Sequence, residues 1–150
     1  MRGALRRGGV GQAAVRLARR YGARVIATAS PAKHMVVKEL GADVVLDSRR
    51  PDLAEAILRL TGGVDLVLES VGEATFPVSL AVAKPVTGRI VVFGAASGHA
   101  TLTTHDLLFT WRVQVKGLHR LASACTGPWR LRLTGAPAFR GIPDMIMVTG

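Results

Sequence analysis

Short apolar runs alternate along the chain with stretches in which apolar residues recur every three or four positions. The runs have the length and composition of buried parallel strands, and the stretches between them have the period of amphipathic helices. Strands are predicted at residues 25–29, 44–46, 65–68 and 89–93, with a further edge strand at 113–118. Helices are predicted at residues 31–40, 52–61 and 75–83, with a short helix at 107–111. This alternation predicts an α/β fold, with a doubly wound parallel sheet covered by helices on both faces.

A glycine-rich turn precedes this series and leads into its first helix. The turn consists of Gly8, Gly9, Val10 and Gly11. Glycines let the backbone bend tightly and approach a ligand closely, while the free N–H groups at a helix start attract anions. The apolar residues that follow at helical spacing are Val10, Ala14, Leu17, Ala18 and Tyr21. We therefore expect a phosphate-binding turn that runs directly into an amphipathic helix.

Both ends of the chain break the pattern. The first seven residues stand where such a sheet needs a buried central strand, but three of them are arginines that could not all be buried. The first strand is therefore expected to be degraded or missing, or reduced to Gly3, Ala4 and Leu5. From residue 121 onward no helical or strand period persists, and glycine and proline are frequent. We predict one partial domain at 1–120 and an irregular, disordered tail at 121–150.

Composition narrows the class of protein. With 150 residues, of which 49% are hydrophobic, the chain can form one domain with one core. No apolar run approaches the roughly 18 residues that a membrane span needs, and no signal-peptide pattern follows the N-terminus. The single cysteine, Cys125, excludes an internal disulfide and agrees with a reducing compartment. These features predict a soluble cytoplasmic protein.

The positive charge is concentrated at the N-terminal end. Net charge is +10, and nine lysines and arginines precede the first acidic residue, Glu39. A basic end can bind nucleic acid, but no interleaved aromatic residues or nucleic-acid motif accompany it here. The same charge surrounds the glycine-rich turn, where it would favour a polyphosphate ligand. For most of these arginines a solvated helix face is an equally good explanation.

Four stretches carry a resemblance to a known family. They are residues 8–11 (GGVG), 41–43 (GAD), 65–72 (DLVLESVG) and 88–94 (GRIVVFG). In this order they resemble the cofactor-binding domain of the medium-chain dehydrogenase/reductase superfamily, and most of all its zinc-free quinone oxidoreductase (zeta-crystallin-like) branch. The resemblance covers about residues 8–120 and implies a Rossmann-type sheet. In the family this domain follows a separate barrel-like domain that supplies most of the substrate pocket.

That barrel-like, catalytic domain is absent from this sequence. The residues after Arg120 match nothing in the family, and Leu5 and Arg6 replace the small residues that precede its paired glycines. Two foreign-looking ends around a regular middle suggest a truncated or frame-disturbed gene product. Whether the chain is an enzyme by itself therefore stays open, and the resemblance assigns no catalytic residue to it.

The predicted cofactor is NADP(H), in preference to NAD(H). An NAD-preferring domain usually ends its second strand with an acidic residue that binds the ribose hydroxyls, and this chain has Ala29 there. The resemblance places Ser30, Lys33 and Arg49 to bind a 2′-phosphate, although Ser48 replaces a family tyrosine. The alternatives are a plain helix cap for Ser30 and solvated surface charges for the two basic residues.

The other expected cofactor contacts follow the fourth and fifth strands of the family sheet. Ligands of open α/β sheets bind at the carboxyl ends of the strands. By resemblance, the residues that flank the nicotinamide and its ribose there are Val71, Gly72, Phe93, Gly94 and Ala95. The glycine-rich turn, from Gly8 to Gly11, would contact the pyrophosphate. Glu69 and Ser70 are read only as polar residues at a strand end.

No metal site is predicted. The histidines are His34, His99, His105 and His119. None has a metal-ligand spacing to another or to Cys125, so we expect no zinc in this chain. Hydride transfer needs no such site, because the cofactor carries the chemistry and the protein orients it.

Three functions of different classes remain from the sequence. The leading one is the NADP(H)-binding domain of an oxidoreductase whose parent enzyme transfers hydride to an electron-poor carbonyl, enone or quinone. The second is a non-catalytic fragment that binds the dinucleotide or associates with another subunit. Relatives pair through the last strand of this domain, so a homodimer through the strand between Val113 and Leu118 is possible. The third, remote alternative is a basic nucleic-acid-binding fragment.

Overall fold

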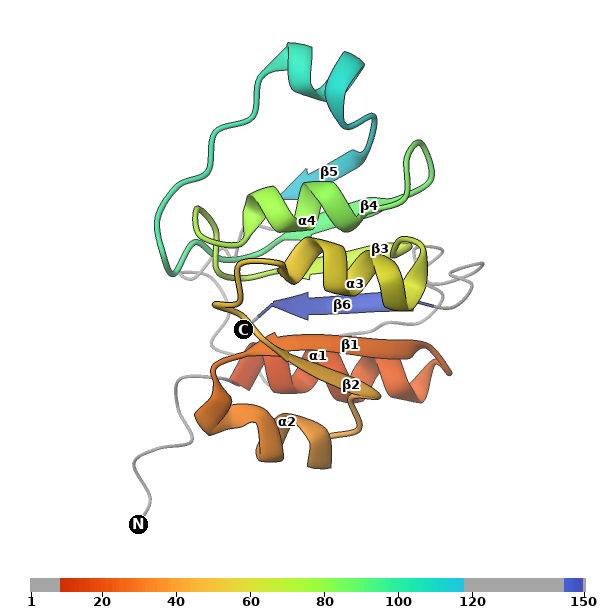
Figure 1. The fold of residues 1–150 in the computed structure, drawn as a ribbon, viewed down its shortest axis with the longest axis vertical. Coiled ribbons are helices and arrows are strands. Elements are labelled where there is room, and N and C mark those ends of the chain that lie inside the picture. The colour runs from red at the N-terminus through yellow and green to blue at the C-terminus, as the bar shows by residue number, and fades with distance from the viewer. Residues whose placement is uncertain (1–8, 118–144, 150) are drawn as a thin grey trace, which may run out of the picture.

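The structure, a computed structural model, describes residues 9–117 and 145–149 (Figure 1). In these residues one six-stranded sheet has the order β2-β1-β6-β3-β4-β5, and every neighbouring pair is parallel. The strands are β1 (Arg24–Ala29), β2 (Val44–Asp47), β3 (Leu66–Glu69), β4 (Arg89–Val92), β5 (Gln114–Gly117) and β6 (Met145–Thr149). The predicted parallel α/β sheet is thereby confirmed.

Helices cover both faces of the sheet. They are α1 (Gly9–Arg20), α2 (His34–Glu39), α3 (Leu53–Thr61) and α4 (Phe76–Val82), with the short segments η2 (Pro31–Lys33) and η3 (Asp106–Thr110). Side chains of α1 and α2 join one buried cluster, together with Val25 and Leu66 of the strands. Side chains of α3 and α4 join the other, together with Val67 and Ile90. Since successive strand residues point to opposite faces, the two clusters are the two layers of a doubly wound sheet.

The centre of the sheet is occupied by β6. This strand pairs with β1 from Arg24 to Thr28 on one side and with β3 from Leu66 to Leu68 on the other. If β6 is counted first, the strand order becomes 3-2-1-4-5-6, which is the Rossmann order. A segment late in the sequence therefore forms the central strand, the position expected from the sequence for residues 1–7. Residues 1–8 themselves lie outside the described part.

The strand β6 differs from the irregular tail predicted at 121–150. Of that tail, residues 121–144 and 150 lie outside the described residues, and 145–149 form the strand. Its sequence, MIMVT, is a short run of apolar and β-branched residues, which suits a position buried on both faces. Met147 is fully buried there and packs in the cluster under α3 and α4. The surrounding glycines and prolines concealed this run in the sequence pattern.

Helix α1 begins earlier and is rotated relative to the prediction. Its first residue is Gly9, so Gly9, Val10 and Gly11 form the first helical turn instead of a turn before the helix. Val15 and Ala18 are its buried residues, whereas Tyr21, predicted on the apolar face, is 50% exposed. Tyr21 lies past the last helical residue, Arg20, where the chain turns toward β1.

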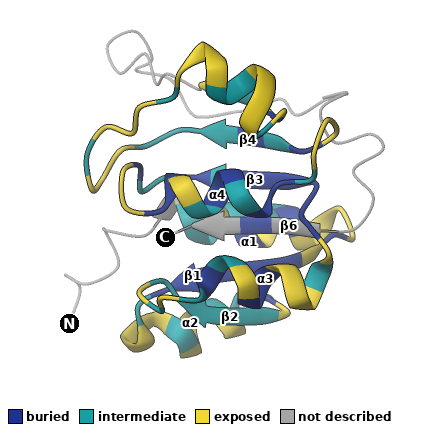
Figure 2. Cartoon of the chain, turned by 45° about the horizontal axis from the view of Figure 1, so that its top comes forward, coloured by how far each residue is buried: buried dark blue, intermediate teal, exposed yellow. Residues whose placement is uncertain are grey.

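Burial falls off toward β5 at one edge of the sheet. Figure 2 shows α4 and β3 mostly buried and the segment around η3 mostly exposed. Leu108 and Phe109 of η3 are exposed, while Val113 just before β5 is buried in the cluster under α3 and α4. In residues 9–117 and 145–149, no helix has the length and apolar character to cross a membrane.

Candidate functional site at the carboxyl edge of the sheet

All six strands end at the same edge of the sheet, on the left in Figure 1. Helix α1 begins at this edge, and the loops after β1, β2, β3 and β4 leave from it. In open α/β sheets the crevice outside this edge is where ligands bind. The predicted site residues that the structure describes all lie in these loops or in the first turn of α1. The parallel topology thus places residues from five separate stretches of sequence along one edge of the sheet.

The first turn of α1 lies at this edge, with its N–H groups at the start of the helix. The first N–H groups of a helix have no carbonyl partner within it, and the helix dipole adds positive potential there. No acidic residue lies in the first turn of α1, so nothing on the helix neutralises that potential. A methyl group built on Gly11 would meet no atom within 4 Å, so the space beside this residue is open. Gly8, the first glycine of the predicted turn, lies outside the described residues.

The end of β1 meets the turn after β2. Ala29, the last residue of β1, accepts a hydrogen bond from the Ser48 N–H at 3.1 Å, which places the two loops side by side. Ser30 follows with an extended backbone and is half-buried, and its side chain forms no cap bond to η2. The predicted capping by this hydroxyl is therefore wrong for the described structure. Lys33 is exposed at the end of η2.

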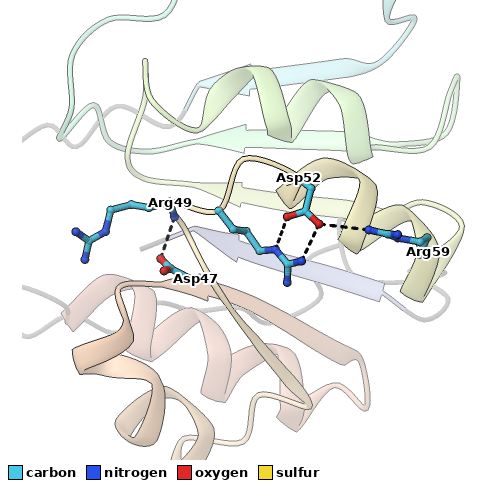
Figure 3. A network of polar contacts seen from close by, with 5 residues as sticks. Asp47, Arg49, Asp52 and Arg59 are labelled. Carbon is cyan, nitrogen blue, oxygen red and sulfur yellow. Dashed lines mark hydrogen bonds and ion pairs between the residues drawn. The ribbon is translucent and has the colours of Figure 1, made fainter.

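Arg49 stands apart from the other arginines of this region. Its backbone N–H donates to Asp47 Oδ1 at 3.0 Å, which fixes the turn. Its side chain is exposed and extends away from the neighbouring cluster of charges (Figure 3). Within the described residues the guanidinium has no ion-pair partner. It remains available for an anion from outside.

The neighbouring charges are committed to one another. Arg50 holds both carboxylate oxygens of Asp52 at 2.7 Å, and Arg59 Nη2 lies 3.3 Å from Asp52 Oδ2 (Figure 3). The hydrogen bonds from Arg50 lower the pKa of Asp52, and the same contact raises the pKa of Arg50. Asp52 is the N-cap residue of α3, yet its side chain makes no cap bond. Asp52 and Glu55 have the sequence spacing of a capping box, but the ion pair forms instead, because two charge-assisted bonds outcompete one bond to a backbone N–H.

The loops after β3 and β4 are joined along their backbones. Ser97 N–H donates to Val71 O at 2.7 Å, Glu73 N–H donates to Gly98 O at 3.2 Å, and Gly72 and Gly98 form a parallel bridge. A methyl group on Gly72 would collide with Gly98 O, and one on Gly94 would lie 2.5 Å from Ser70 O. These two predicted site residues are therefore glycines for a reason of close approach, which is compatible with a ligand contact as well.

The remaining predicted residues also lie on these loops. Phe93 donates its N–H to Glu69 O at 2.9 Å directly after β4. Phe93 and Val71 are half-buried, and Ala95 is exposed. They form the part of the edge beyond β3 and β4, while Ser30, Lys33 and Arg49 form the part beyond β1 and β2. Helix α1 starts at the same edge and lies behind β1 in the view of Figure 1.

Two residues of this edge were not assigned a role from the sequence. Glu69 is fully buried and accepts hydrogen bonds from the turn that follows it, and Ser97 binds that turn from the opposite side. For Glu69 the sequence did hold a signal of such a role, because an acidic residue at the end of an apolar strand is unusual. For Ser97 the sequence held no such signal, because Ser97 meets Val71 only once the chain has folded.

The residues 9–131 match the family model described as zinc-binding dehydrogenase. The chain belongs to this family. Among the described residues of this zinc-binding dehydrogenase domain, no three His, Cys, Asp or Glu side chains are grouped to hold a metal ion. The matched range includes every described element except β6, which lies beyond it.

Relatives of this zinc-binding dehydrogenase domain include synthases and reductases. The chain is 49% identical to the spectinabilin polyketide synthase system protein NorB of Streptomyces orinoci over 88 residues. The aligned part is 58% of this chain and 4% of NorB. The crystal structure of the CurK enoyl reductase is 38% identical, with a TM-score of 0.63, over 74% of this chain and 33% of that one. The Escherichia coli quinone oxidoreductase complexed with NADPH is 31% identical, with a TM-score of 0.67, over 73% of this chain and 34% of that one. The chain thus spans about a third of these solved proteins.

Proposed function

We propose that this chain is the NADPH-binding part of a reductase that acts on an electron-poor double bond, quinone or carbonyl. The observation that carries the proposal is the composition of the edge beyond β1 and β2. Ala29 leaves no carboxylate to repel a 2′-phosphate, and Arg49, with no ion pair of its own in the described residues, lies in the adjoining turn. Ser30 and Lys33 complete this polar group. Two similar structures support the proposal: the E. coli quinone oxidoreductase was solved with NADPH, and CurK is an enoyl reductase.

The residues present fit an anionic dinucleotide. The first turn of α1 offers N–H groups that have no partner within the helix, and an open space beside Gly11, for the pyrophosphate. Thr28, the second-last residue of β1, is 2% exposed, and its hydroxyl has no hydrogen-bond partner in the described structure. A buried hydroxyl without a partner is costly, and this one lies one residue before the edge at which we place the cofactor.

In this proposal each group of residues has one task. The start of α1 holds the pyrophosphate, and Ser30, Lys33 and Arg49 bind the 2′-phosphate. Val71 and Gly72 on one loop, with Phe93, Gly94 and Ala95 on the other, flank the nicotinamide and its ribose. The bound cofactor supplies the hydride, and the chain positions it. The substrate pocket of the whole enzyme is expected on a further domain, as the family resemblance implies.

The test is a titration of the purified chain with NADPH and, separately, with NADH, followed by cofactor fluorescence and thermal unfolding. We expect NADPH to bind at least about tenfold more tightly, because one charge-assisted phosphate contact contributes this much. A ligand at 100 times its Kd stabilises the folded state by about 2.7 kcal/mol, which a melting curve resolves. Cooperative melting with no stabilisation by either cofactor would refute the proposal. Equal affinities would refute the assignment of the 2′-phosphate site.

A second candidate function is subunit association. Within residues 9–117 and 145–149, β5 pairs only with β4 and is an edge strand of the sheet. Such an edge can pair with the same strand of a second copy. Sedimentation of the chain tests this: a dimer that dissociates when a proline replaces Val115 would support it, and a monomer at high concentration would exclude it.

A further inference from the structure

Glu69 is a fully buried carboxylate at the end of β3. Its Oε1 accepts hydrogen bonds from the N–H of Val71 at 2.8 Å, the N–H of Gly72 at 3.1 Å and the hydroxyl of Thr75 at 2.7 Å. Its Oε2 accepts one from the hydroxyl of Ser79 at 2.5 Å. A buried charge is expensive unless its hydrogen bonds are satisfied, so these four donors account for its presence in the core.

These contacts hold two structures at once. Thr75 and Ser79 belong to the start of α4, so the carboxylate ties that helix to β3. The N–H groups of Val71 and Gly72 belong to the turn that follows β3 at the carboxyl edge of the sheet. The turn is therefore fixed from inside the domain, by an acceptor that does not itself reach the surface.

Ser97 fixes the same turn from outside. Its N–H and its hydroxyl both donate to Val71 O, at 2.7 and 2.9 Å, and the hydroxyl accepts from the N–H of Ala74 at 2.9 Å. Both backbone polar groups of Val71 are thus engaged, one by Glu69 and one by Ser97. The backbone of Val71 is thus fixed at the ligand edge, and its side chain is half-buried there.

We propose that Glu69 is a positioning residue for the nicotinamide half of the cofactor, with Ser97 as its counterpart on the neighbouring loop. This inference rests on the proposed function, because it assumes that Val71 and Gly72 flank the nicotinamide. Preorganising this turn removes an ordering cost from binding, and the benefit falls on that half of the ligand alone. The adenosine half is bound beyond β1 and β2, by residues that Glu69 does not contact.

The experiment compares two ligands, NADPH and 2′,5′-ADP, which retains the adenosine and 2′-phosphate but lacks the nicotinamide. The variant Glu69→Met keeps the length of the side chain and removes every acceptor. We expect its affinity for NADPH to fall about tenfold and its affinity for 2′,5′-ADP to stay within about twofold. Glu69→Gln keeps one carbonyl oxygen as acceptor for both N–H groups, so it should recover most of the NADPH affinity.

Two further variants keep the test decisive if Glu69→Met does not fold. Ser97→Ala is an exposed substitution that removes the two hydroxyl bonds, to Val71 O and from the N–H of Ala74, and keeps the backbone bond to Val71 O. It loosens the turn from the other side and should weaken NADPH alone, by about threefold. Ser79→Ala is the matched control, because it loosens α4 without touching the turn and should leave the ratio of the two affinities unchanged. A purely structural role for the network would instead make Ser79→Ala as damaging as Ser97→Ala.

The outcomes separate this inference from the proposed function. If the unmodified chain binds neither ligand, the proposed function fails and this inference falls with it. If the unmodified chain binds both and the ratio is the same in Glu69→Met or Ser97→Ala, only the positioning role is overturned. Loss of NADPH affinity at constant 2′,5′-ADP affinity, with recovery in Glu69→Gln, supports it.

Discussion

Arg49 is the residue on which the choice between the two nicotinamide cofactors should depend. Its guanidinium has no ion pair in the described residues, and its backbone N–H, not its side chain, fixes the turn. Arg49→Gln should therefore leave stability unchanged and weaken NADPH binding about tenfold, while NADH binding changes little. Arg59→Gln is the matched control, since that arginine already binds Asp52. Equal losses for NADPH and NADH in Arg49→Gln would contradict the assignment.

Gly94 and Gly11 should respond oppositely to the same added methyl group. In Gly94→Ala the new carbon would lie 2.5 Å from the backbone oxygen of Ser70, so the two joined loops must separate, at a cost of about 1–3 kcal/mol. In Gly11→Ala it enters open space in the first helical turn, so stability should hold or rise by up to about 1 kcal/mol. Urea unfolding measures both. If the proposed pyrophosphate site is right, Gly11→Ala nevertheless binds NADPH more weakly.

The sequence indicated that the predicted site residues share one edge of the sheet, but it did not indicate which residues they contact. Ser30 and Gly94 follow predicted strands directly and Arg49 lies in the turn after one, so a parallel sheet places them at one edge. The contact between Val71 and Ser97 spans 26 positions and forms only when the loops after β3 and β4 meet. No local pattern encodes such a contact. The buried network around Glu69 was missed for the same reason, although its members lie within ten residues.

At the scale of elements, the strands and helices between residues 24 and 117 were predicted nearly to the residue, whereas β6 and the side-chain partners at the helix starts were not. Apolar periodicity specifies where an element lies, and Gly62 ends α3 in the left-handed conformation, as a glycine there suggests. Whether a side chain caps a helix depends on which of several competing hydrogen-bond partners it binds. Asp52 had the position of a capping residue, but the arginine two positions before it binds the carboxylate first.

The ion pair at the start of α3 should make part of the stability depend on pH. The hydrogen bonds from Arg50 lower the pKa of Asp52 below 3.8, so its contribution is complete above that pH and disappears as the pH falls through the folded-state pKa. Asp52→Asn should be slightly less stable than the parent at pH 7, because exposed pairs contribute little, and equally stable in strong acid.

Thermal unfolding of both chains across this pH range provides the measurement. Glu55→Gln controls for the loss of a charge in the same helical turn, because that side chain has no ion pair in the described residues. A difference between Asp52→Asn and the parent that persists well below pH 3.8 would show that the charge is not its source.

At the scale of the whole molecule, the sequence predicted the layers and the parallel topology but not which segment completes the sheet. A five-residue apolar run is too short to have a recognisable period, and its neighbours favoured an irregular tail. The segment is recognisable as a strand only in the folded sheet, where it fills the position between β1 and β3. Those two strands do not pair with each other, and each binds β6.

Met147 should consequently be one of the most sensitive positions in the protein. It is fully buried at the middle of the sheet, so Met147→Ala should cost about 2–5 kcal/mol, and Met147→Lys should prevent folding. Met35→Ala on α2, where the side chain is 75% exposed, should stay within about 0.5 kcal/mol of the parent. Chemical denaturation measures both. Unchanged stability in Met147→Ala would mean that β6 does not occupy this position in solution.

The late position of β6 also has a consequence for how the chain reaches its native state. Arg24 pairs with Met145, so the middle of the sheet joins residues 121 positions apart, and the loop between them must close before these contacts form. During synthesis β1 and β2 on one side, and β3, β4 and β5 on the other, emerge before the strand that connects them. Until it arrives, two strand edges in the interior stay open to any other extended segment, so the nascent protein should depend on chaperones and fold slowly compared with a domain whose central strand is made first.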